Sequence, residues 1–315
     1  MSAAAIEIRD LRVDYGNFTA VHDVSLTIPW GEVFGLVGPN GAGKTSTFRV
    51  LATLMEPTYG EVAIAGLDIL EQTRHAREII GYMPDLAPVP SDLRAWEFLD
   101  FHADTHRLGP RRRRLERVEE CLAAVKLTAK RNAWCKELSR GQTQNLVLAK
   151  TLLHHPRVLV LDEPASGLDP LSRREMRLTL QALAHHGATV LVSSHILSEL
   201  AGMCSSMCVM NQGRLLAAGT AADVRRELGR TERALTAVVL DHPEALSQWL
   251  AGRPQVGDIG VDGTRVVFGF AGNDHDQARL LQDMAAAGLG LKSLREEESS
   301  FEDILVEVAK ANRQP

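Results

Sequence analysis

The first two hundred residues contain three short runs made almost wholly of apolar side chains. These runs are Val33–Val37, Val158–Leu161 and Thr189–Val192. Strands of a parallel sheet have this unbroken pattern, because helices cover both faces of such a sheet. Segments with helical spacing of apolar positions lie between the runs, so the predicted fold class is α/β.

A different pattern surrounds the first run. Val24–Ile28 alternates apolar and polar residues, as a strand with one buried face does. Over residues 1–65 the sequence therefore predicts short strands joined by turns. Residues 86–153 instead carry apolar side chains at helical spacing, among them Leu115, Val118 and Leu122, and predict a helical insert.

The helical insert contains a run of four arginines, Arg111 to Arg114. Two interpretations of this run stay open. It is either the solvated start of a helix, which is the commoner case, or a site for phosphate or lipid.

Near residues 222–233 the pattern starts afresh. The chain then runs strand, helix, strand, strand, helix, strand, with an Asp262-Gly263 hairpin signal between the middle strands. A last helix is expected to begin near Ser299. This order resembles a ferredoxin-like unit and predicts a small C-terminal α+β domain. The expected domains are residues 1–225, with a helical part over about 86–153, and residues 232–315.

Charge and composition narrow the class of protein. The chain has 315 residues, 35 basic and 40 acidic, for a formal net charge of −5. Neither part is strongly basic, so nucleic-acid binding is not expected. No apolar run approaches the roughly 18–20 residues that cross a bilayer. The N-terminus lacks a signal-peptide pattern, and the four cysteines form no C-x-x-C pair, so we expect reduced thiols in the cytoplasm.

The strongest motif follows the first apolar run. Gly38-Pro39-Asn40-Gly41-Ala42-Gly43-Lys44-Thr45, with Ser46 after it, fits G-x-x-x-x-G-K-[ST] between a strand and a helix. Glycines let backbone N–H groups surround a phosphate, and the helix N-terminus adds partial positive charge. Lys44 is expected to reach the β and γ phosphates, and the Thr45 hydroxyl to bind Mg²⁺.

A pair of acids follows the second apolar run. Asp162 and Glu163 stand at the carboxyl end of a predicted parallel strand, where ligands bind in α/β sheets. Asp162 is the expected Mg²⁺ partner through water, and Glu163 the general base for the attacking water. These motifs alone indicate an ATPase or GTPase with a P-loop.

Leu138-Ser139-Arg140-Gly141-Gln142 narrows this further. The segment resembles the LSGGQ signature of ATP-binding-cassette (ABC) proteins, about 20 residues before the acidic pair. It also suggests a second phosphate-binding nest at a helix start. In that family the signature of one subunit closes over the P-loop of another. The resemblance therefore implies a P-loop ATPase fold with an antiparallel β subdomain, and a dimer with ATP in its interface.

Other features of the ABC family fit residues 1–225. Tyr15 stands where the family has an aromatic residue that stacks on adenine. Ser166 to Asp169 matches the D-loop, which crosses the dimer interface through residues such as Asp169. His195 follows the third apolar run, where the family has its switch histidine. The resemblance implies Lys44, Glu163 and His195 as the catalytic residues.

Two positions depart from the family. Arg140 replaces the first glycine of the signature pair, and its side chain is expected to point outward. Asp85 replaces a glutamine that contacts Mg²⁺ and the attacking water. Asp85 can also be a Mg²⁺ ligand, but it adds negative charge beside the phosphates. We therefore expect an altered hydrolysis rate or coupling, without loss of activity.

Two weaker signals, a pair of histidines and a pair of cysteines, are interpreted as structural residues. His102 and His106 are four residues apart on a predicted helix, a spacing compatible with zinc, but no third ligand is apparent. Cys204 and Cys208 are expected to be buried thiols at a strand start.

The leading hypothesis is the ATP-binding subunit of an ABC transporter, with ATP and Mg²⁺ as cofactors. Its expected partners are a separately encoded membrane permease and a second copy of the chain or a paralogous ATPase. It would lie on the cytoplasmic face of the membrane, and the tail resembles those of bacterial drug, antibiotic and lipid exporters. An importer that works with a periplasmic binding protein stays open as well. Two further alternatives are a soluble ABC ATPase that clamps nucleic acid, ribosomes or a protein assembly, and a regulatory module that binds ATP without hydrolysis. The C-terminal domain is a candidate for dimerisation or ligand sensing, or is a capping domain with no independent role.

Overall fold

The computed structural model describes residues 4–195, 200, 203–220, 223–224, 227 and 233–296. The chain divides into two compact units, Met1–Thr220 and Ala221–Pro315. The predicted last helix near Ser299 lies outside the described residues. None of the described helices combines the length and apolar character needed to cross a membrane.

An antiparallel sheet is formed by the strands that begin the first unit. Its central pairing joins β1 to β2, with Ile6 opposite Ile28 and Tyr15 opposite Phe18. Alternate residues of β1 are buried, so the sheet has one apolar face, as the alternation in the sequence predicts. In spatial order the strands are β2 (Phe18–Ile28), β1 (Ile6–Tyr15), β4 (Tyr59–Ile64) and β5 (Leu67–Asp68).

The second sheet of this unit contains the three apolar runs as neighbouring parallel strands, which confirms their prediction. Val33 pairs with Val190, and Val158 with Thr189, so all three run in one direction. Their carboxyl ends consequently meet at one edge of the sheet. In spatial order the strands are β10 (Arg214–Gly219), β9 (Ser206–Asn211), β3 (Val33–Val37), β8 (Thr189–Ser194), β7 (Val158–Leu161) and β6 (Ile80–Met83); only β10 is antiparallel to its neighbour.

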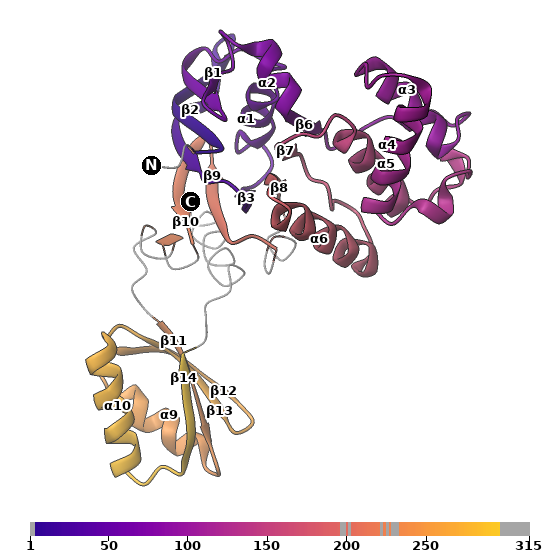
Figure 1. Cartoon of the computed structure of the whole chain (residues 1–315). Coiled ribbons are helices and arrows are strands. Elements are labelled where there is room, and N and C mark those ends of the chain that lie inside the picture. The colour runs from indigo at the N-terminus through magenta and orange to yellow at the C-terminus, as the bar shows by residue number, and fades with distance from the viewer. Residues whose placement is uncertain are drawn as a thin grey trace. The chain divides into compact units, whose positions relative to one another are not determined.

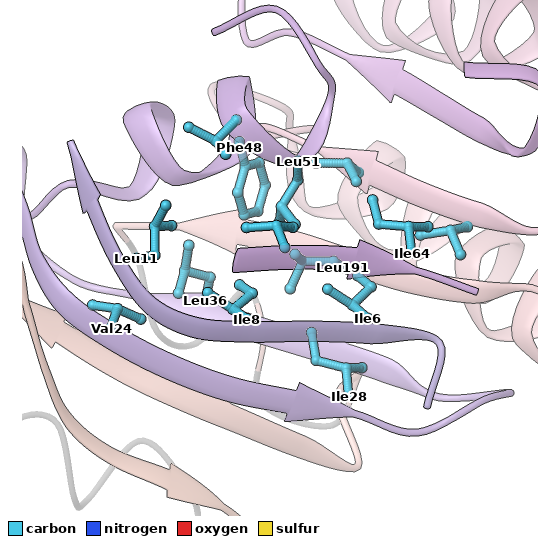
Figure 2. Close-up of a cluster of buried hydrophobic side chains, with 14 of the residues drawn as sticks. Ile6, Ile8, Leu11, Val24, Ile28, Leu36, Phe48, Leu51, Ile64 and Leu191 are labelled. Carbon is cyan, nitrogen blue, oxygen red and sulfur yellow. The ribbon is translucent and has the colours of Figure 1, made fainter. Parts of the chain in front are cut away.

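Helix α1 (Lys44–Leu51) packs in the core that both sheets share. Phe48 and Leu51 point from α1 into the apolar cluster between the strands (Figure 2), and both are fully buried. Strand residues such as Ile6, Ile28 and Leu191 complete this cluster. Burial of side chains of this size stabilises the fold by about 1.5–3 kcal/mol each. The core therefore fixes the start of α1 relative to the ends of the parallel strands.

The predicted helical insert is confirmed. Between β6 and β7 the chain forms three α-helices and two short 3₁₀ helices, Thr128–Lys130 and Cys135–Glu137, with no strand. The α-helices gather at one end of the first unit, away from β1 and β2 (Figure 1). Their bounds are Ala95–Thr105 for α3, Arg111–Ala124 for α4 and Arg140–Leu152 for α5; the remaining helices of this unit with described bounds are α2 (Thr73–Ile79) and α6 (Pro170–His185).

The second unit has the predicted order of strands and helices. Its four strands form one fully antiparallel sheet, and both helices cover the same face (Figure 1). Gly263, with φ 57°, begins a two-residue loop between paired Asp262 and Arg265, which confirms the hairpin. The elements are β11 (Arg233–Val239), α9 (Pro243–Ala251), β12 (Val256–Asp262), β13 (Arg265–Phe270), α10 (Asp274–Ala286) and β14 (Leu291–Glu296), with sheet order β12-β13-β11-β14.

The two cysteines predicted to be buried differ from each other. Cys208 lies inside β9 and is buried, which raises the pKa of its thiol. Cys204 precedes that strand and is only half-buried, so the expectation of a fully buried residue is wrong for it, although desolvation still raises the pKa of its thiol to about 12. Both thiols are therefore protonated at neutral pH.

Replacing Phe48 with alanine should destabilise the first unit. Phe48 is 0% exposed within the shared core, and such a deletion typically costs about 3–5 kcal/mol of unfolding free energy. Urea unfolding measures this loss. Leu54→Ala is the control, because Leu54 is 63% exposed and its removal should change stability by less than about 0.5 kcal/mol. Equal stability losses in the two variants would contradict the assignment of the core.

Candidate active site

The loop between β3 and α1 requires glycine at defined positions. Gly41 and Gly43 have φ angles of 82° and 98°, a region that side chains disfavour. A Cβ on Gly43 would also lie 2.6 Å from the carbonyl oxygen of Ala20. The loop can therefore turn its backbone toward the start of α1 only with glycine at these positions.

Lys44 begins α1 and is almost fully buried. Its ammonium donates hydrogen bonds to the carbonyl oxygens of Gly38 (2.7 Å) and Pro39 (3.3 Å), and Nζ lies 3.7 Å from Glu163 Oε1. Burial lowers the pKa of Lys44, whereas the charges of Glu163 and Asp162 oppose that change. The cation is thus held in place beside the acids that end β7.

One hydroxyl group positions both acids. Ser193, on β8, donates from Oγ to Asp162 Oδ1 at 2.6 Å and accepts a hydrogen bond from the Glu163 backbone N–H at 2.9 Å. Asp162 is 2% exposed, so this bond satisfies part of a buried carboxylate. Glu163 has a φ of 49°, a strained conformation for a residue other than glycine. The backbone of Glu163 is therefore fixed next to Asp162 by the same hydroxyl group.

The Glu163 carboxylate lies between the side chains of Lys44 and His195. Lys44 approaches Oε1, and His195 donates from Nδ1 to Oε2 at 2.5 Å. The side chain of Glu163 is 14% exposed, so these contacts are only partly screened by water. Glu163 is therefore held at a fixed position while one edge of its carboxylate remains accessible.

These groups open onto one cavity of 590 Å³. At the β1–β2 end it is lined by Tyr15 and Phe18, whose exposed rings are paired across the hairpin. Tyr15 Oη also lies 3.2 Å from Ser46 Oγ. The structure brings these predicted residues to the cavity: Tyr15, Asn40, Gly41, Ala42, Gly43, Lys44, Thr45, Ser46, Asp85, Asp162, Glu163 and His195.

Three further residues line this cavity without having been predicted from the sequence: Phe18, Ala20 and Arg49. Phe18 had a usable signal, since an exposed aromatic residue directly follows the Gly16-Asn17 turn after Tyr15. Arg49 lies on α1 and had no motif to mark it. Gly38 and Pro39 begin the loop after β3 and are absent from the cavity lining, but their carbonyl groups bind Lys44.

The oxygen atoms of Thr45, Asp162 and Asp85 suit a Mg²⁺ ion, which prefers hard oxygen ligands. Desolvation raises the pKa of Asp85, and Glu163 and Asp162 raise it further, whereas Arg140 and His195 oppose the change. A divalent cation would relieve the repulsion among these carboxylates.

The signature-like segment does not line the cavity of its own chain. Ser139 caps α5: its Oγ accepts from the Gln142 N–H at 3.3 Å, and Gln142 Oε1 accepts from the Ser139 N–H at 3.1 Å. Gly141 packs on α6, where a Cβ would lie 2.6 Å from Ser172 Oγ. Leu138 precedes the cap. The segment forms an ordered helix start that is separate from the P-loop.

Arg140, at the start of α5, is exposed, and its side chain packs against a neighbouring loop. Its guanidinium lies over Gly167, so that a Cβ on Gly167 would be 2.6 Å from Nη1. Gly167 has a φ of 66° and leaves space for the arginine. Asp169 in the same loop caps α6, accepting from the N–H groups of Leu171 and Ser172 at 3.0 Å. The Ser172 hydroxyl, which donates to Asp169 Oδ2 at 2.6 Å, lowers the pKa of Asp169 most, and these backbone N–H groups lower it further.

The two histidines with zinc-like spacing differ in their contacts. His106 stacks on His154 with ring centroids 4.4 Å apart, and His102 packs edge-on against Phe98. Burial lowers the pKa of His102 to about 4, with help from Lys150 and His106. Among the residues that the structure places, no group of three or more side chains is arranged to hold a metal ion.

Comparison with known proteins gives consistent matches. The family described as ABC transporter matches residues 21–166. The probable multidrug ABC transporter ATP-binding protein YbhF of Escherichia coli (strain K12) is 35% identical over 228 residues, 72% of this chain and 39% of that protein. The chain thus spans about two fifths of that relative. The Nod factor export ATP-binding protein I of Burkholderia orbicola (strain AU 1054) is 36% identical over 230 residues, 73% of this chain and 75% of that protein.

Two solved structures share the fold. An ATP-binding subunit of an ABC transporter is 28% identical with a TM-score of 0.63, covering 71% of this chain and 93% of the other. The dimeric bacterial ABC transporter cassette MJ0796 is 24% identical with a TM-score of 0.62, covering 68% of this chain and 98% of the other.

Replacing Ser193 with alanine should weaken both the fold and the site. Asp162 would lose its buried hydrogen bond and the Glu163 N–H its acceptor, at a cost of about 1–3 kcal/mol in unfolding free energy. Urea unfolding and ATP turnover are the measurements. Ser205→Ala is the control, because among the described residues its hydroxyl makes one long contact, 3.5 Å to the Val33 carbonyl. Wild-type turnover in Ser193→Ala would contradict the positioning role.

Acid should destabilise the chain partly through His102. Its pKa in the folded state, about 4, lies below the ordinary 6.5, so the unfolded chain takes up a proton that the folded chain does not. Stability due to this residue is therefore present above pH 6.5 and falls as the pH drops toward 4. Unfolding free energies at about pH 7 and about pH 5 should differ less in His102→Gln than in the wild type. An unchanged difference would exclude His102 as a cause.

Proposed function

The chain belongs to the ABC transporter family of ATP-binding proteins, and from this premise we propose that it hydrolyses ATP to drive export through a separate membrane permease. The observation that carries the proposal is the position of Glu163 between Lys44 and His195, in a cavity that a P-loop lines. A carboxylate in this position can accept the proton of a water molecule that attacks a bound γ-phosphate.

Each residue has a distinct part in the proposed reaction. The glycine loop and the start of α1 bind the phosphates, and Lys44 places a positive charge beside the γ-phosphate. Glu163 removes the proton from the attacking water, and His195 holds the Glu163 carboxylate in position. Thr45, Asp162 and Asp85 would hold Mg²⁺, which neutralises charge that develops on the phosphate oxygens. Tyr15, with Phe18 beside it, offers rings on which the adenine can stack.

We propose a dimer as the active form. The segment Leu138–Gln142 lies outside the cavity of its own chain, so a second subunit is needed to bring such a segment to the nucleotide. Asp169 and its loop are expected at the same interface. The dimeric cassette with the same fold supports this arrangement. Because one chain carries both the P-loop and the signature-like segment, a homodimer with two complete sites is the simplest form.

The partner and the direction of transport are inferred from the relatives. By name, one relative is a probable multidrug ABC transporter ATP-binding protein and the other is a Nod factor export ATP-binding protein. A permease that spans the membrane would hold this chain at the cytoplasmic face. These relatives support the transporter proposal over a soluble clamp on nucleic acid, ribosomes or another assembly.

The second unit is proposed to be a ferredoxin-like accessory domain over residues 232–315, attached to an ATPase domain over residues 1–225. The strand order β12-β13-β11-β14 and the alternation of strands and helices support this assignment. Dimerisation and sensing of the transported ligand are its candidate roles.

Glu163→Gln tests the proposed reaction. The amide keeps the shape of the side chain but cannot accept the water proton, so turnover should fall by at least about 100-fold. ATP binding should persist, and the variant should accumulate as an ATP-bound dimer. Phosphate release measures turnover, and gel filtration with and without ATP measures dimerisation.

Glu71→Gln is the matched control, since Glu71 is exposed and lies outside the cavity. It should behave as the wild type in both assays. If wild type and Glu163→Gln bound ATP equally but neither released phosphate, the chain would be a regulatory nucleotide-binding module. Absence of ATP binding in the wild type would reject the nucleotide site itself.

A further inference from the structure

The arginine run at the start of α4 is a sequence feature to which the proposed function gives no role. Two of its members are ion-paired: Arg112 Nε lies 3.0 Å from Glu116 Oε1, and Arg114 Nε lies 2.9 Å from Asp100 Oδ1. The guanidinium group of Arg113 makes no hydrogen bond or ion pair within the described part of the chain, and neither does that of Arg107 in the turn before α4. The arginines of the run therefore differ in their partners: acidic side chains neutralise Arg112 and Arg114, whereas the Arg113 guanidinium has no such partner among the described residues.

The two unpaired guanidinium groups of Arg107 and Arg113 line the same cavity, which has a volume of 320 Å³. No carboxylate lines it. Its walls are formed by Arg107, Leu108, Gly109, Arg113, Arg117 and His155. We name this the arginine cavity. Three cationic side chains converge on a space without an acidic group, which is unusual for arginines that only solvate a helix surface.

Arg117 is a rigid wall of the arginine cavity. Its Nε–H donates to the Leu153 carbonyl at 2.9 Å, Nη2 donates to the Leu152 carbonyl at 2.5 Å, and Nη1 lies 2.9 Å from Glu120. The side chain is only 18% exposed. These bonds use three of the five N–H donors of a guanidinium, so the group is held in one orientation with donors to spare. A ligand that binds here need not order this residue first.

Electrostatics in the arginine cavity favour an anion. The charges of Arg107, Arg113 and Arg117 repel one another, and among these three only Arg117 has an ion pair within the described part of the chain. The positive charge around the cavity affects His155. Burial lowers the pKa of its imidazole, the charges of Arg117 and Arg113 lower it further, and the charge of Glu120 raises it. A neutral imidazole still offers one N–H donor at pH 7. A bound anion would remove the repulsion and accept hydrogen bonds from several sides.

We propose that the arginine cavity is a binding site for a phosphate group, distinct from the nucleotide cavity. Guanidinium groups bind phosphate oxygens through paired N–H donors, and a tetrahedral group with several acceptor oxygens matches donors that converge from three side chains. The site would take the phosphate of a soluble anion or of an anionic lipid headgroup. In the second case it would hold this subunit at a membrane surface.

Binding is measured on the full chain with saturating Mg²⁺ and a non-hydrolysable ATP analogue, whose three phosphates fill the nucleotide cavity so that it does not take up the probe. One arm titrates inorganic phosphate by calorimetry. The other measures flotation with phosphatidylcholine vesicles that contain roughly one quarter phosphatidylglycerol, against vesicles of phosphatidylcholine alone. Neither readout needs ATP turnover, so the outcome does not depend on the proposed function.

Two double variants with equal loss of charge are compared. Arg107→Gln with Arg113→Gln removes both unpaired groups of the arginine cavity and should weaken binding of the probe by at least about tenfold. Arg111→Gln with Arg112→Gln removes two charges from the same helix start outside the cavity, and should change binding by less than about twofold. Thermal unfolding of each variant checks that its fold is retained, which is expected because the Arg112–Glu116 pair is exposed and such pairs contribute little to stability.

Loss of phosphate binding in the cavity variant alone supports the proposal with a soluble anion as ligand. Loss of vesicle binding in the cavity variant alone supports it with a lipid headgroup as ligand. Equal losses in the two variants mean a general effect of surface charge and overturn the proposal. It is also overturned if the wild type binds neither probe.

Discussion

The contact between the buried Lys44 ammonium and the Glu163 carboxylate is the interaction on which the arrangement of the active site depends. A buried cation is costly unless it has an anionic partner and hydrogen-bond acceptors, and the structure supplies both. Lys44 is fixed by α1 and by the glycine loop, whereas Glu163 is fixed by β7 and by Ser193 on the neighbouring strand. The site is thus a product of the two-sheet core, which sets the distance between α1 and the strand ends.

Most of the fold and much of the site could be predicted from local patterns. The runs Val33–Val37 and Val158–Leu161 identify buried parallel strands, because burial on both faces leaves no polar positions. The glycine-lysine motif identifies the phosphate loop, because its backbone conformation has few sequence solutions. Phe18 was missed since its relation to Tyr15 comes from pairing across a hairpin, and Arg49 because helix position alone does not mark a cavity.

Contacts between distant segments are what the sequence could not reveal. Nothing local to Arg140 indicates that its guanidinium lies over Gly167, since the contact depends on how α5 and α6 pack. The same holds for Arg113 and Arg107, which differ from Arg112 only in whether an acid lies within reach. The two departures from the family also meet through charge, because Arg140 is one of the groups that lower the pKa of Asp85. A sequence motif specifies residue types, whereas the side chains that each of these residues contacts are known only from the fold.

The pairing of β3 with β8 has a consequence for how the active site comes into being. These strands are neighbours in the sheet, yet Val33 and Val190 are separated by most of the first unit. Closing so long a loop is slow, because the chain loses conformational entropy before the contacts between the two strands can form and stabilise it. The P-loop emerges early during synthesis, whereas Ser193 and His195 emerge only after the whole helical insert. A nascent chain therefore carries the phosphate loop long before it has the residues of the complete cavity, which are all present only when synthesis has passed β8.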